Sequence, residues 1–448
     1  MRIFGTDGIR GKVGEYPVTV ECALKIGRAL SVTLSTTKPM RVVVGRDTRI
    51  SGEMLESAFA AGLNSAGVDV LRTGVVPTPA VAALARQMEA GAAVSISASH
   101  NPFEDNGFKF FNGEGRKLSD EEEAAVEEAF HSVEQSAPQR TGAEVGQMSN
   151  LESAEDFYVE TVLARFPPDF RLEGVTIVVD GSHGAGCRTT PKALSALGAN
   201  VKLFFAEPNG ININESCGST HPETLSELVR RTGAQLGLAH DGDADRVVFA
   251  DENGQILDGD EFLAILGNHA LKRGELPGAG LVATVLSNFG LDESISKAGG
   301  RVIRAAVGDR HVAEEMARND LFLGGEQSGH FIFRDVSLTG DGLVSALKLL
   351  HVMQQTGKAL SELRTCMVKF PQVAKNIPVK IKPPLETLSG FPEAIETAKS
   401  AIGDKGRILV RYSGTERLCR LLAEGPHQEV LEREIERLAN LLIAEIGA

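Results

Sequence analysis

The feature that most constrains the fold of this 448-residue chain is a pattern of segments that occurs three times. Each copy contains apolar strands, helices that end near glycine, and a last strand that opens into a polar loop. The last strands and their loops are "GAAVSIS" before "ASHNP", "AQLGLAH" before "DGDADR", and "DLFLGG" before "EQSGH". Strands that alternate with helices favour mostly parallel sheets covered by helices. The sequence therefore predicts three similar α/β units.

The first copy shows this pattern most clearly. The apolar run Arg41–Gly45 predicts a strand. In the segment that follows, Leu55, Phe59 and Leu63 fall on one helical face, and Ser51 is the predicted N-cap. The helix is expected to end at "SAGVDV", and a strand is expected to follow.

The final part of the chain departs from the repeated pattern. It offers the strands "QVAKNIPVKI" and "GRILV", and a closing helix with apolar residues at helical spacing. These apolar residues are Leu431, Ile435, Leu438, Leu442 and Ile446. Polar stretches at residues 131–150, 251–259 and 366–371 mark the expected boundaries. We predict α/β domains over residues 1–150, 151–254 and 255–367, and a smaller α+β domain over residues 368–448.

The predicted fold class is therefore α/β, with three mostly parallel, mixed sheets and a smaller C-terminal domain. Ligands gather at the carboxyl ends of strands in such sheets, where all three polar loops lie. We expect the loops to face one central cleft.

Composition and charge limit what this cleft binds. The net charge of −14 argues against a general nucleic-acid or membrane-surface binder, since those surfaces are normally basic. No run of about 18 apolar residues is present to span a membrane. Residues 1–10 lack the apolar stretch of a signal peptide, and the five scattered cysteines suit reduced thiols. We expect a cytoplasmic protein.

The loop "DGDADR" predicts a metal site. Asp241, Asp243 and Asp245 alternate with small residues, and alternate side chains of an extended loop point the same way. Three converging carboxylates are unfavourable without a cation, and they suit Mg²⁺ or another hard divalent ion. A solvated acidic turn is one weaker interpretation. A calcium-binding loop that includes Glu252 is another, but Arg246 stands where that loop needs glycine.

Ser99 follows a strand in the loop "SASHNP". Alone, this segment is best interpreted as a polar turn in which Ser99 or Asn101 caps a helix. Neighbouring side chains point apart, so Ser99 and His100 are not expected to pair as nucleophile and base. The G-x-S-x-G elbow of hydrolases is also missing. Beside a metal loop from the next unit, however, Ser99 becomes a candidate phosphate carrier.

Two further loops offer ligand-binding groups. In "GEQSGH", Glu326, Gln327 and Ser328 provide a carboxylate, an amide and a hydroxyl that suit a sugar's hydroxyl groups, although an ordinary tight turn is the alternative. "RYSGTE" offers an anion pocket or, alternatively, a capped turn. The pocket residues are Arg411, Ser413, Gly414 and Thr415. Arg10 and Lys109 are further candidate cations at the site. Alternatively, each is an ordinary charged residue of the protein surface.

Together these motifs resemble the α-D-phosphohexomutase superfamily. "SASHNP", "DGDADR", "GEQSGH" and "RYSGTE" occur in that superfamily's order, one in each predicted domain, and the N-terminal "GTDGIRG" also fits. The resemblance covers essentially the whole chain and implies a heart-shaped, four-domain fold. The Gln327 form of the sugar loop is most similar to members that interconvert glucosamine 6-phosphate and glucosamine 1-phosphate, towards UDP-N-acetylglucosamine.

The resemblance also implies the roles of the site residues. Ser99 is the phosphoserine, and one Mg²⁺ per chain is ligated by its phosphate together with Asp241, Asp243 and Asp245. These groups leave a surplus of about −3, counted from their usual ionisation states.

Cations are therefore needed around this cluster. Arg246, Lys109 and Arg10 are the candidates to offset the surplus charge and to stabilise the transferred group. His330 and Lys109 are both candidates for the general base.

Two alternatives remain open. One is a mutase of the same superfamily that acts on mannose or glucose phosphates. The other is a metal-dependent sugar-phosphate-binding protein without turnover, although the combination of Ser99 with three aspartates favours an enzyme. A small sugar phosphate is the expected partner, with neither nucleic acid nor membrane. The sequence leaves the oligomeric state open, with a homodimer as one alternative.

Overall fold

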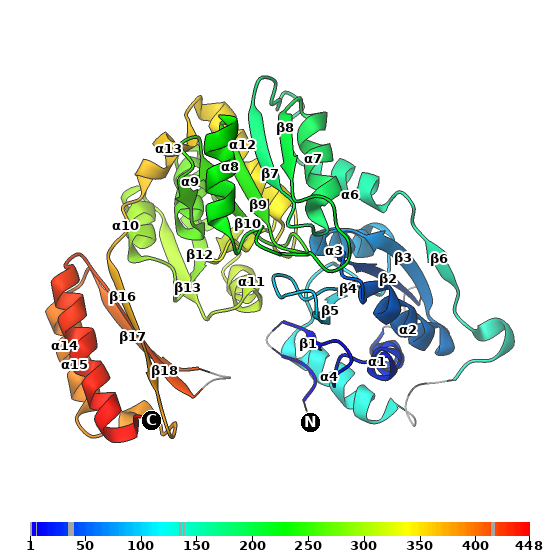
Figure 1. Ribbon diagram of the computed structural model, residues 1–448, viewed down its shortest axis with the longest axis horizontal. Coiled ribbons are helices and arrows are strands. Elements are labelled where there is room, and N and C mark those ends of the chain that lie inside the picture. The colour runs from blue at the N-terminus through cyan, green and yellow to red at the C-terminus, as the bar shows by residue number, and fades with distance from the viewer. Residues whose placement is uncertain (1, 6, 35–39, 134–136, 138, 414–416) are drawn as a thin grey trace. The chain divides into compact units, whose positions relative to one another are not determined.

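The computed structural model describes residues 2–5, 7–34, 40–133, 137, 139–413 and 417–448. It consists of two compact units, one formed by Met1–Leu286 with Gly300–Thr365 and the other by Ser287–Gly299 with Cys366–Ala448. Within the described residues, the first unit contains three β-sheets and the second contains one (Figure 1).

The first sheet of the first unit has the strand order β1-β5-β4-β2-β3-β6. Its strands are β1 (Ile9–Lys12), β2 (Arg41–Arg46), β3 (Asp69–Val75), β4 (Ala92–Ile96), β5 (Asp105–Asn112) and β6 (Met148–Asn150). The helices of this segment are α1 (Val20–Thr33), α2 (Gly52–Ser65), α3 (Thr78–Gln87) and α4 (Asp120–His131). Strands β4, β2, β3 and β6 run parallel, and β5 and β1 add antiparallel pairs at one edge.

The predicted helix after β2 is confirmed, and Ser51 stands at its N-cap position as predicted. Leu55, Phe59 and Leu63 of α2 are fully buried, as their helical spacing predicts. The Ser51 side chain makes no capping hydrogen bond. Its hydroxyl instead accepts a hydrogen bond from Nδ2 of Asn106 on β5 at 2.9 Å. The Ser51 side chain therefore bonds to a distant residue and not to the backbone N–H groups at the start of α2.

The second and third sheets of the first unit are also mixed. Their orders are β11-β10-β9-β7-β8 and β13-β12-β14-β15, with parallel pairs around β7 and β12 and antiparallel pairs at one edge. The strands of the second sheet are β7 (Thr176–Asp180), β8 (Asn200–Phe204), β9 (Leu236–His240), β10 (Val247–Asp251) and β11 (Ile256–Leu257). Those of the third are β12 (Gly280–Thr284), β13 (Arg301–Ala305), β14 (Leu323–Gly325) and β15 (Phe331–Phe333).

Helices accompany both of these sheets, as the repeated pattern predicts. They are α6 (Ala154–Leu163), α7 (Gly186–Ala196), α8 (Pro222–Thr232), α9 (Gly259–Arg273), α11 (Asp309–Arg318), α12 (Gly342–Thr356) and α13 (Leu360–Leu363). Short 3₁₀ helices occur at Gly142–Glu144, Pro277–Ala279, Arg364–Cys366 and Leu385–Thr387.

The second unit has a three-stranded antiparallel sheet of order β16-β18-β17, as expected for an α+β fold. Its elements are α10 (Phe289–Lys297), β16 (Gln372–Pro378), α14 (Phe391–Ile402), β17 (Arg407–Tyr412), β18 (Leu418–Glu424) and α15 (Gln428–Ile446). Helices α14 and α15 lie on the same face of this sheet (Figure 1). The five apolar residues predicted for the closing helix are all buried on α15.

Among the helices that the structure describes, none is both long and apolar enough to cross a bilayer. The five cysteines, all among the described residues, form no disulfide.

Candidate active site

Loops that follow β4, β9 and β14, one from each sheet of the first unit, come together. The Ser99 hydroxyl donates to Oδ2 of Asp241 at 2.5 Å. Arg246 and His330 form an isolated antiparallel bridge between the second and third loops. Thr78, which begins α3, donates its hydroxyl to Oδ2 of Asp243 at 2.6 Å. The structure thus places the predicted phosphate carrier beside the predicted metal loop.

The backbone at Ser99 adopts an unusual conformation that distant side chains hold in place. Its φ of 53° lies in the left-handed region, which is rare for residues other than glycine and is often found at functional sites. The buried Arg49 donates to the carbonyl oxygens of Ser99 and Asn101 at 2.9 and 2.8 Å. Nδ2 of Asn214 also donates to the Ser99 carbonyl, at 2.9 Å. Sequence reasoning missed Arg49 and Asn214.

His100 lies closer to Ser99 than the sequence predicted. Its Nδ1 is 3.3 Å from the Ser99 hydroxyl, so the expectation that the two side chains point apart is wrong. The left-handed backbone at Ser99 brings the neighbouring side chains together. Burial, and then the charges of Arg246 and Arg10, lower the pKa of His100 to about 4. The imidazole is therefore uncharged near neutral pH.

The three aspartates of the second loop converge as predicted. They are buried, and one ligand oxygen from each lies within 4.8 Å of the others. The physical reason differs from the prediction, because Ala244 has a φ of 55° and the loop is a turn rather than an extended segment. A tight turn therefore gathers Asp241, Asp243 and Asp245.

Lys109 pairs with two of these carboxylates. It lies on β5 opposite Ser95, and its Nζ is 2.7 Å from Oδ2 of Asp243 and 2.6 Å from Oδ2 of Asp245. Burial alone would lower the pKa of Lys109, but Asp243 and then Asp245 raise it above its ordinary value. Lys109 is consequently a fixed cation in this arrangement.

The three-aspartate cluster also contains carboxylate oxygens that Lys109 does not pair. Burial, and then the like charges of Asp245 and Asp243, raise the pKa of Asp241 well above its usual range. Oδ1 of Asp243 and Oδ1 of Asp245 are buried and have no hydrogen-bond partner among the described residues. Buried carboxylate oxygens of this kind fit a hard divalent cation such as Mg²⁺.

The alternative calcium-loop interpretation is wrong. The segment after Arg246 is strand β10 rather than a helix. The Glu252 carboxylate accepts a hydrogen bond from the Ser361 hydroxyl and is not part of the three-aspartate cluster.

The other predicted cations, Arg246 and Arg10, also lie here. The Arg246 backbone N–H donates to Oδ1 of Asp241 at 3.1 Å, and its Nη1 lies 3.4 Å from Nδ1 of His100. Burial alone would lower the pKa of Arg246, but Asp245 and Asp241 raise it. Arg10 donates to Oδ2 of Asp7, a residue that sequence reasoning missed.

Asp7 begins a chain of alternating charges. Nζ of Lys117 is 2.6 Å from Oδ1 of Asp7 and also contacts Asp309. Oδ2 of Asp309 is 3.3 Å from Nε2 of His330, whose Nδ1 is 3.7 Å from Oδ1 of Asp245. The contact between Lys117 and Asp309 joins the first and third repeats, so no local sequence signal predicts it.

His330 has a partner in either protonation state. When Nε2 is unprotonated it accepts from the Gly340 N–H at 3.1 Å. When both ring nitrogens are protonated, the imidazolium faces Asp309 and Asp245. Burial alone would lower the pKa of His330, but Asp309 and then Asp245 raise it. These partners suit a group that takes up and releases a proton.

The loop that is predicted to bind the sugar rests on the N-terminus of α9. Oε1 of Glu326 accepts from the Gly308 N–H at 3.0 Å. Nε2 of Gln327 donates to Oδ2 of Asp260 at 3.0 Å, and the Gln327 carbonyl accepts from the Gly259 N–H at 3.1 Å. Ser328 is exposed. One side of the Gln327 amide is therefore already engaged by the protein.

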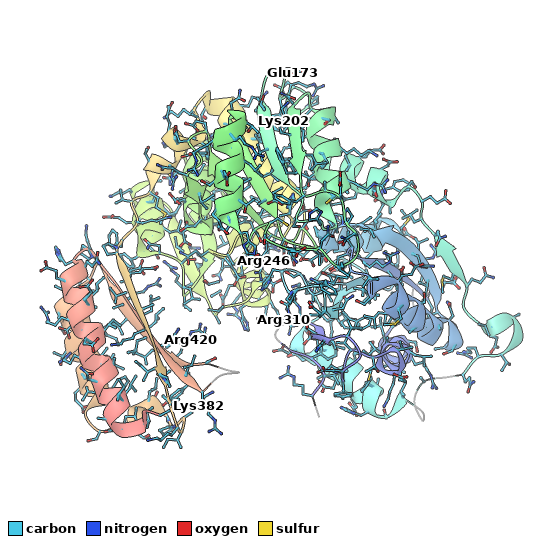
Figure 2. The ribbon with its side chains drawn as sticks, viewed as in Figure 1. Glu173, Lys202, Arg246, Arg310, Lys382 and Arg420 are labelled. Carbon is cyan, nitrogen blue, oxygen red and sulfur yellow. The ribbon has the colours of Figure 1, made fainter. Side chains whose placement is uncertain are left out.

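Part of the predicted anion pocket lies in the second unit. Arg411 is exposed on β17, and Ser413 is buried just beyond it. Gly414 and Thr415 lie outside the described residues. Two cations that sequence reasoning missed are nearby: Nζ of Lys382 donates to the Ser413 carbonyl at 2.6 Å, and Arg420 of β18 is the register partner of Arg411 (Figure 2).

Family models match four successive parts of the chain. They are described as the phosphoglucomutase/phosphomannomutase alpha/beta/alpha domains I, II and III and C-terminal domain, and they match residues 1–137, 156–254, 258–370 and 360–441. The chain belongs to the phosphoglucomutase/phosphomannomutase family of the α-D-phosphohexomutase superfamily. The resemblance seen in the sequence and the predicted fold class are thereby confirmed.

Individual proteins of known name or known structure are also similar to this chain. The phosphoglucosamine mutase of Geotalea daltonii is 46% identical over 447 residues, covering 100% of this chain and 98% of the relative. That of Anaeromyxobacter dehalogenans is 46% identical over 455 residues, covering 100% of this chain and 99% of the relative. A phosphoglucomutase/phosphomannomutase family protein of Burkholderia thailandensis, of known crystal structure, has a TM-score of 0.83 at 25% identity, covering 100% of this chain and 99% of that one.

Proposed function

We propose that this protein is a phosphoglucosamine mutase, an isomerase that interconverts glucosamine 6-phosphate and glucosamine 1-phosphate. The observation that carries the proposal is the Ser99 hydroxyl 2.5 Å from Asp241 inside the three-aspartate cluster. The full-length similarity to phosphoglucosamine mutases supports the choice of sugar.

The proposed domains divide the work. Residues 1–150 carry the phosphoserine, residues 151–254 hold the metal, residues 255–367 recognise the sugar, and residues 368–448 bind the phosphate that is not being transferred. Arg411, Ser413, Gly414 and Thr415 are the proposed phosphate-binding residues.

The proposed reaction begins with a phosphoryl group on Ser99. The O–P bond to Ser99 breaks while a bond forms to the free hydroxyl of the sugar phosphate, which loses its proton to a general base. The resulting bisphosphate turns around, the O–P bond of its other phosphoryl group breaks as a bond forms to the Ser99 oxygen, and the protonated base returns its proton to the freed sugar oxygen. Phosphoryl transfer of this kind depends on positioning and charge neutralisation.

The acidic cluster and the nearby cations supply that neutralisation. A Mg²⁺ held by Asp241, Asp243 and Asp245 would contribute positive charge beside the transferred group. Lys109 balances two aspartates, as its ion pairs indicate, and Arg246 and Arg10 are proposed to stabilise charge on the phosphoryl oxygens.

We assign the general base to His330 rather than Lys109. Lys109 is fixed as a cation by two carboxylates, whereas His330 has partners in both protonation states. His330→Gln is expected to lower kcat by about 100-fold or more while leaving Mg²⁺ affinity nearly unchanged. Lys109→Met is expected to change Mg²⁺ affinity as well. Steady-state kinetics and a calorimetric Mg²⁺ titration of both variants check this assignment, and parent-like turnover of His330→Gln would contradict it.

Gln327 is proposed to read the amino group at carbon 2 of the sugar, while Glu326 and Ser328 bind other hydroxyls. Because Nε2 of Gln327 donates to Asp260, its Oε1 is the atom left to accept from an amine. The competing role is structural, in which the amide only anchors the loop to α9.

Gln327→Met separates these two roles. If the amide oxygen reads the amine, the ratio of kcat/KM on glucosamine 6-phosphate to that on glucose 6-phosphate should fall by about tenfold. Asp260→Asn serves as the control, since it disturbs the anchor and keeps the Gln327 amide. An unchanged ratio, with equal loss on both sugars in the two variants, would show that carbon 2 is read elsewhere.

The choice between substrates tests the proposal as a whole. A mutase of mannose or glucose phosphates is the competing function, because the family model covers those enzymes too. We expect kcat/KM on glucosamine 6-phosphate to exceed that on mannose 6-phosphate and glucose 6-phosphate. A preference for either neutral sugar would replace the proposed substrate with that sugar.

A further inference from the structure

One short segment of the third repeat donates backbone hydrogen bonds to two of the loops that carry the proposed site residues, the loop of His330 and the metal loop of Asp241, Asp243 and Asp245. It comprises residues 339–342, which follow β15 and end at the first residue of α12. The Gly340 N–H donates to Nε2 of His330 at 3.1 Å, and the Gly342 N–H donates to the Ala244 carbonyl of the metal loop at 3.0 Å. The proposed base and the proposed metal site thus depend on the position of the same four residues.

This segment packs too closely on its neighbours to carry side chains at its glycines. A Cβ at Gly340 would lie 2.2 Å from Nε2 of His330, and one at Gly342 would lie 2.5 Å from Nδ1 of His240. Such distances are impossible for real carbon atoms, so the backbone itself is in van der Waals contact with both imidazoles. Any shift of the segment therefore moves His330 and the metal loop as well.

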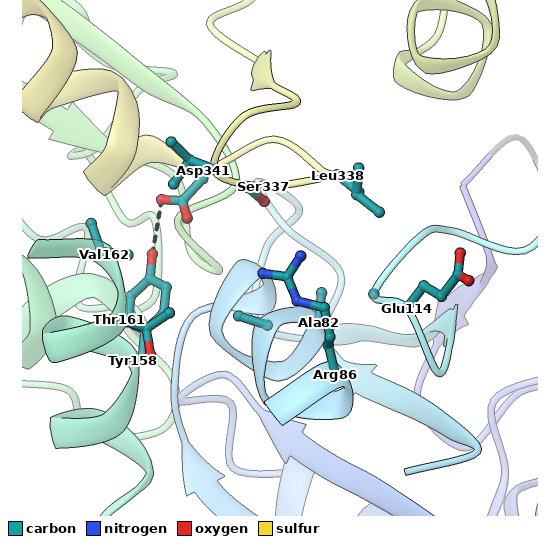
Figure 3. Close-up of a pocket in the computed structure, with 12 residues that line it drawn as sticks. Ala82, Arg86, Glu114, Tyr158, Thr161, Val162, Ser337, Leu338 and Asp341 are labelled. Carbon is teal, nitrogen blue, oxygen red and sulfur yellow. Dashed lines mark hydrogen bonds between the residues drawn. The ribbon is translucent and has the colours of Figure 1, made fainter. Parts of the chain in front are cut away.

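The Asp341 side chain anchors the segment between the two glycines. It is buried, and its Oδ1 accepts from the Val344 N–H at 3.0 Å as the N-cap of α12. The same oxygen accepts from the Tyr158 hydroxyl at 2.8 Å (Figure 3). Tyr158 lies on α6, which belongs to the second repeat, so Asp341 joins helices of two repeats.

We propose that Asp341, held by Tyr158, is a positioning residue for the phosphoryl transfer proposed above, on which this inference rests. Its carboxylate fixes the segment so that the Gly340 N–H orients His330 and the Gly342 N–H supports the metal loop. A displacement of about 1 Å at reacting groups is enough to cost about 100-fold in rate. Asp341 acts through this backbone and does not itself contact the reacting atoms.

A small cavity lies beside the Asp341 carboxylate and bears on how strongly each substitution should act. It has a volume of about 20 Å³ and is lined by Tyr158, Asp341, Arg86, Glu114 and Ser337, among others (Figure 3). That volume admits about one water. In Tyr158→Phe such a water can hydrate the carboxylate, and the N-cap is retained, so this variant should be milder than Asp341→Ala.

The test compares three variants with a matched control. Asp341→Ala removes the anchor and the cap, Asp341→Asn keeps a side chain that can cap and bond, and Tyr158→Phe removes only the hydroxyl. Thr19→Ala is the control, because Thr19 caps α1 through the same kind of bond, to the Cys22 N–H at 3.2 Å, away from the reacting loops. We measure the melting temperature, kcat and KM for glucosamine 6-phosphate, and the Mg²⁺ dissociation constant by calorimetry.

The positioning role predicts a specific pattern. Relative to Thr19→Ala, Asp341→Ala should lose about tenfold or more in kcat with KM within about threefold, and should bind Mg²⁺ several-fold more weakly. Asp341→Asn should restore most of both properties, and Tyr158→Phe should fall between them. Asp341→Ala that matches Thr19→Ala in kcat and in Mg²⁺ affinity would overturn the inference.

Two outcomes need separate treatment. If Asp341→Ala does not fold, Tyr158→Phe decides, and parent-like kcat and Mg²⁺ affinity in that variant would overturn the inference. If the parent protein has no mutase turnover, the proposed function fails. The Mg²⁺ titration then still decides whether Asp341 supports the metal loop.

Discussion

Ser99→Ala is expected to lower mutase turnover by about 10⁴-fold or more, the largest effect of any single substitution. The phosphoryl group has no other carrier in the proposed reaction, since an alanine methyl group forms no O–P bond. The fold should survive, because the Ser99 backbone is held by Arg49 and Asn214 rather than by its own hydroxyl. Coupled assays of turnover and circular dichroism check both expectations.

A matched control shows whether loss of any buried hydroxyl has this effect. Ser226 lies on α8, outside the loops that carry the site residues. Ser226→Ala removes a buried hydroxyl that donates to the Gly254 carbonyl. It should retain turnover close to that of the parent. Substantial activity in a preparation of Ser99→Ala whose mass has been verified would exclude Ser99 as the carrier.

Asp243→Asn is expected to have the second largest effect, a loss of about 100-fold in turnover with Mg²⁺ binding at least about tenfold weaker. The substitution keeps the size of the side chain but removes one negative charge from the buried cluster and one partner from Lys109. Exhaustive chelation of the parent should abolish turnover in the same way, and added Mg²⁺ should restore it.

The control for charge removal is Asp251→Asn. Asp251 is also fully buried, and its Oδ2 lies 3.3 Å from Nη1 of Arg364. It stands at the end of β10 that is far from the metal loop. This variant should lose stability without a selective loss of Mg²⁺ affinity. Full turnover of the parent after exhaustive chelation would show that the transfer proceeds without a divalent metal.

The parts of the fold that local pattern specifies could be predicted from the sequence. Helix α2 and helix α15 bury the residues that their spacing predicts, because burial of one helical face leaves a periodic signal. Strand β6 was missed within the expected linker of residues 131–150. It is only three residues long and exposed, and it forms by pairing with β3, so its own sequence carries no strand pattern.

The site was predictable where its residues lie within short motifs. The convergence of Asp241, Asp243 and Asp245 followed from their spacing, although a turn rather than an extended loop brings them together. The contact between Ser99 and His100 was not predictable, because a left-handed φ at a serine leaves no pattern in the sequence.

Residues that reach the site from distant positions in the chain were also missed by sequence reasoning. Arg49 and Asn214 reach Ser99 from positions 50 and 115 residues away, and Thr78 reaches Asp243 across 165. Such contacts depend on how the sheets pack, which no local pattern encodes. The choice between His330 and Lys109 likewise required the positions of their partners.

A single-turnover experiment tests the central claim most directly. Phosphorylated protein is mixed with one equivalent of glucosamine 6-phosphate, and the reaction is quenched at short times. Peptide mapping then follows the phosphate on Ser99, while mass spectrometry follows the sugar. The account predicts that Ser99 loses its phosphate as a glucosamine bisphosphate forms, and that Ser99 is phosphorylated again as glucosamine 1-phosphate appears. Formation of glucosamine 1-phosphate while the original phosphate stays on Ser99 throughout would contradict it.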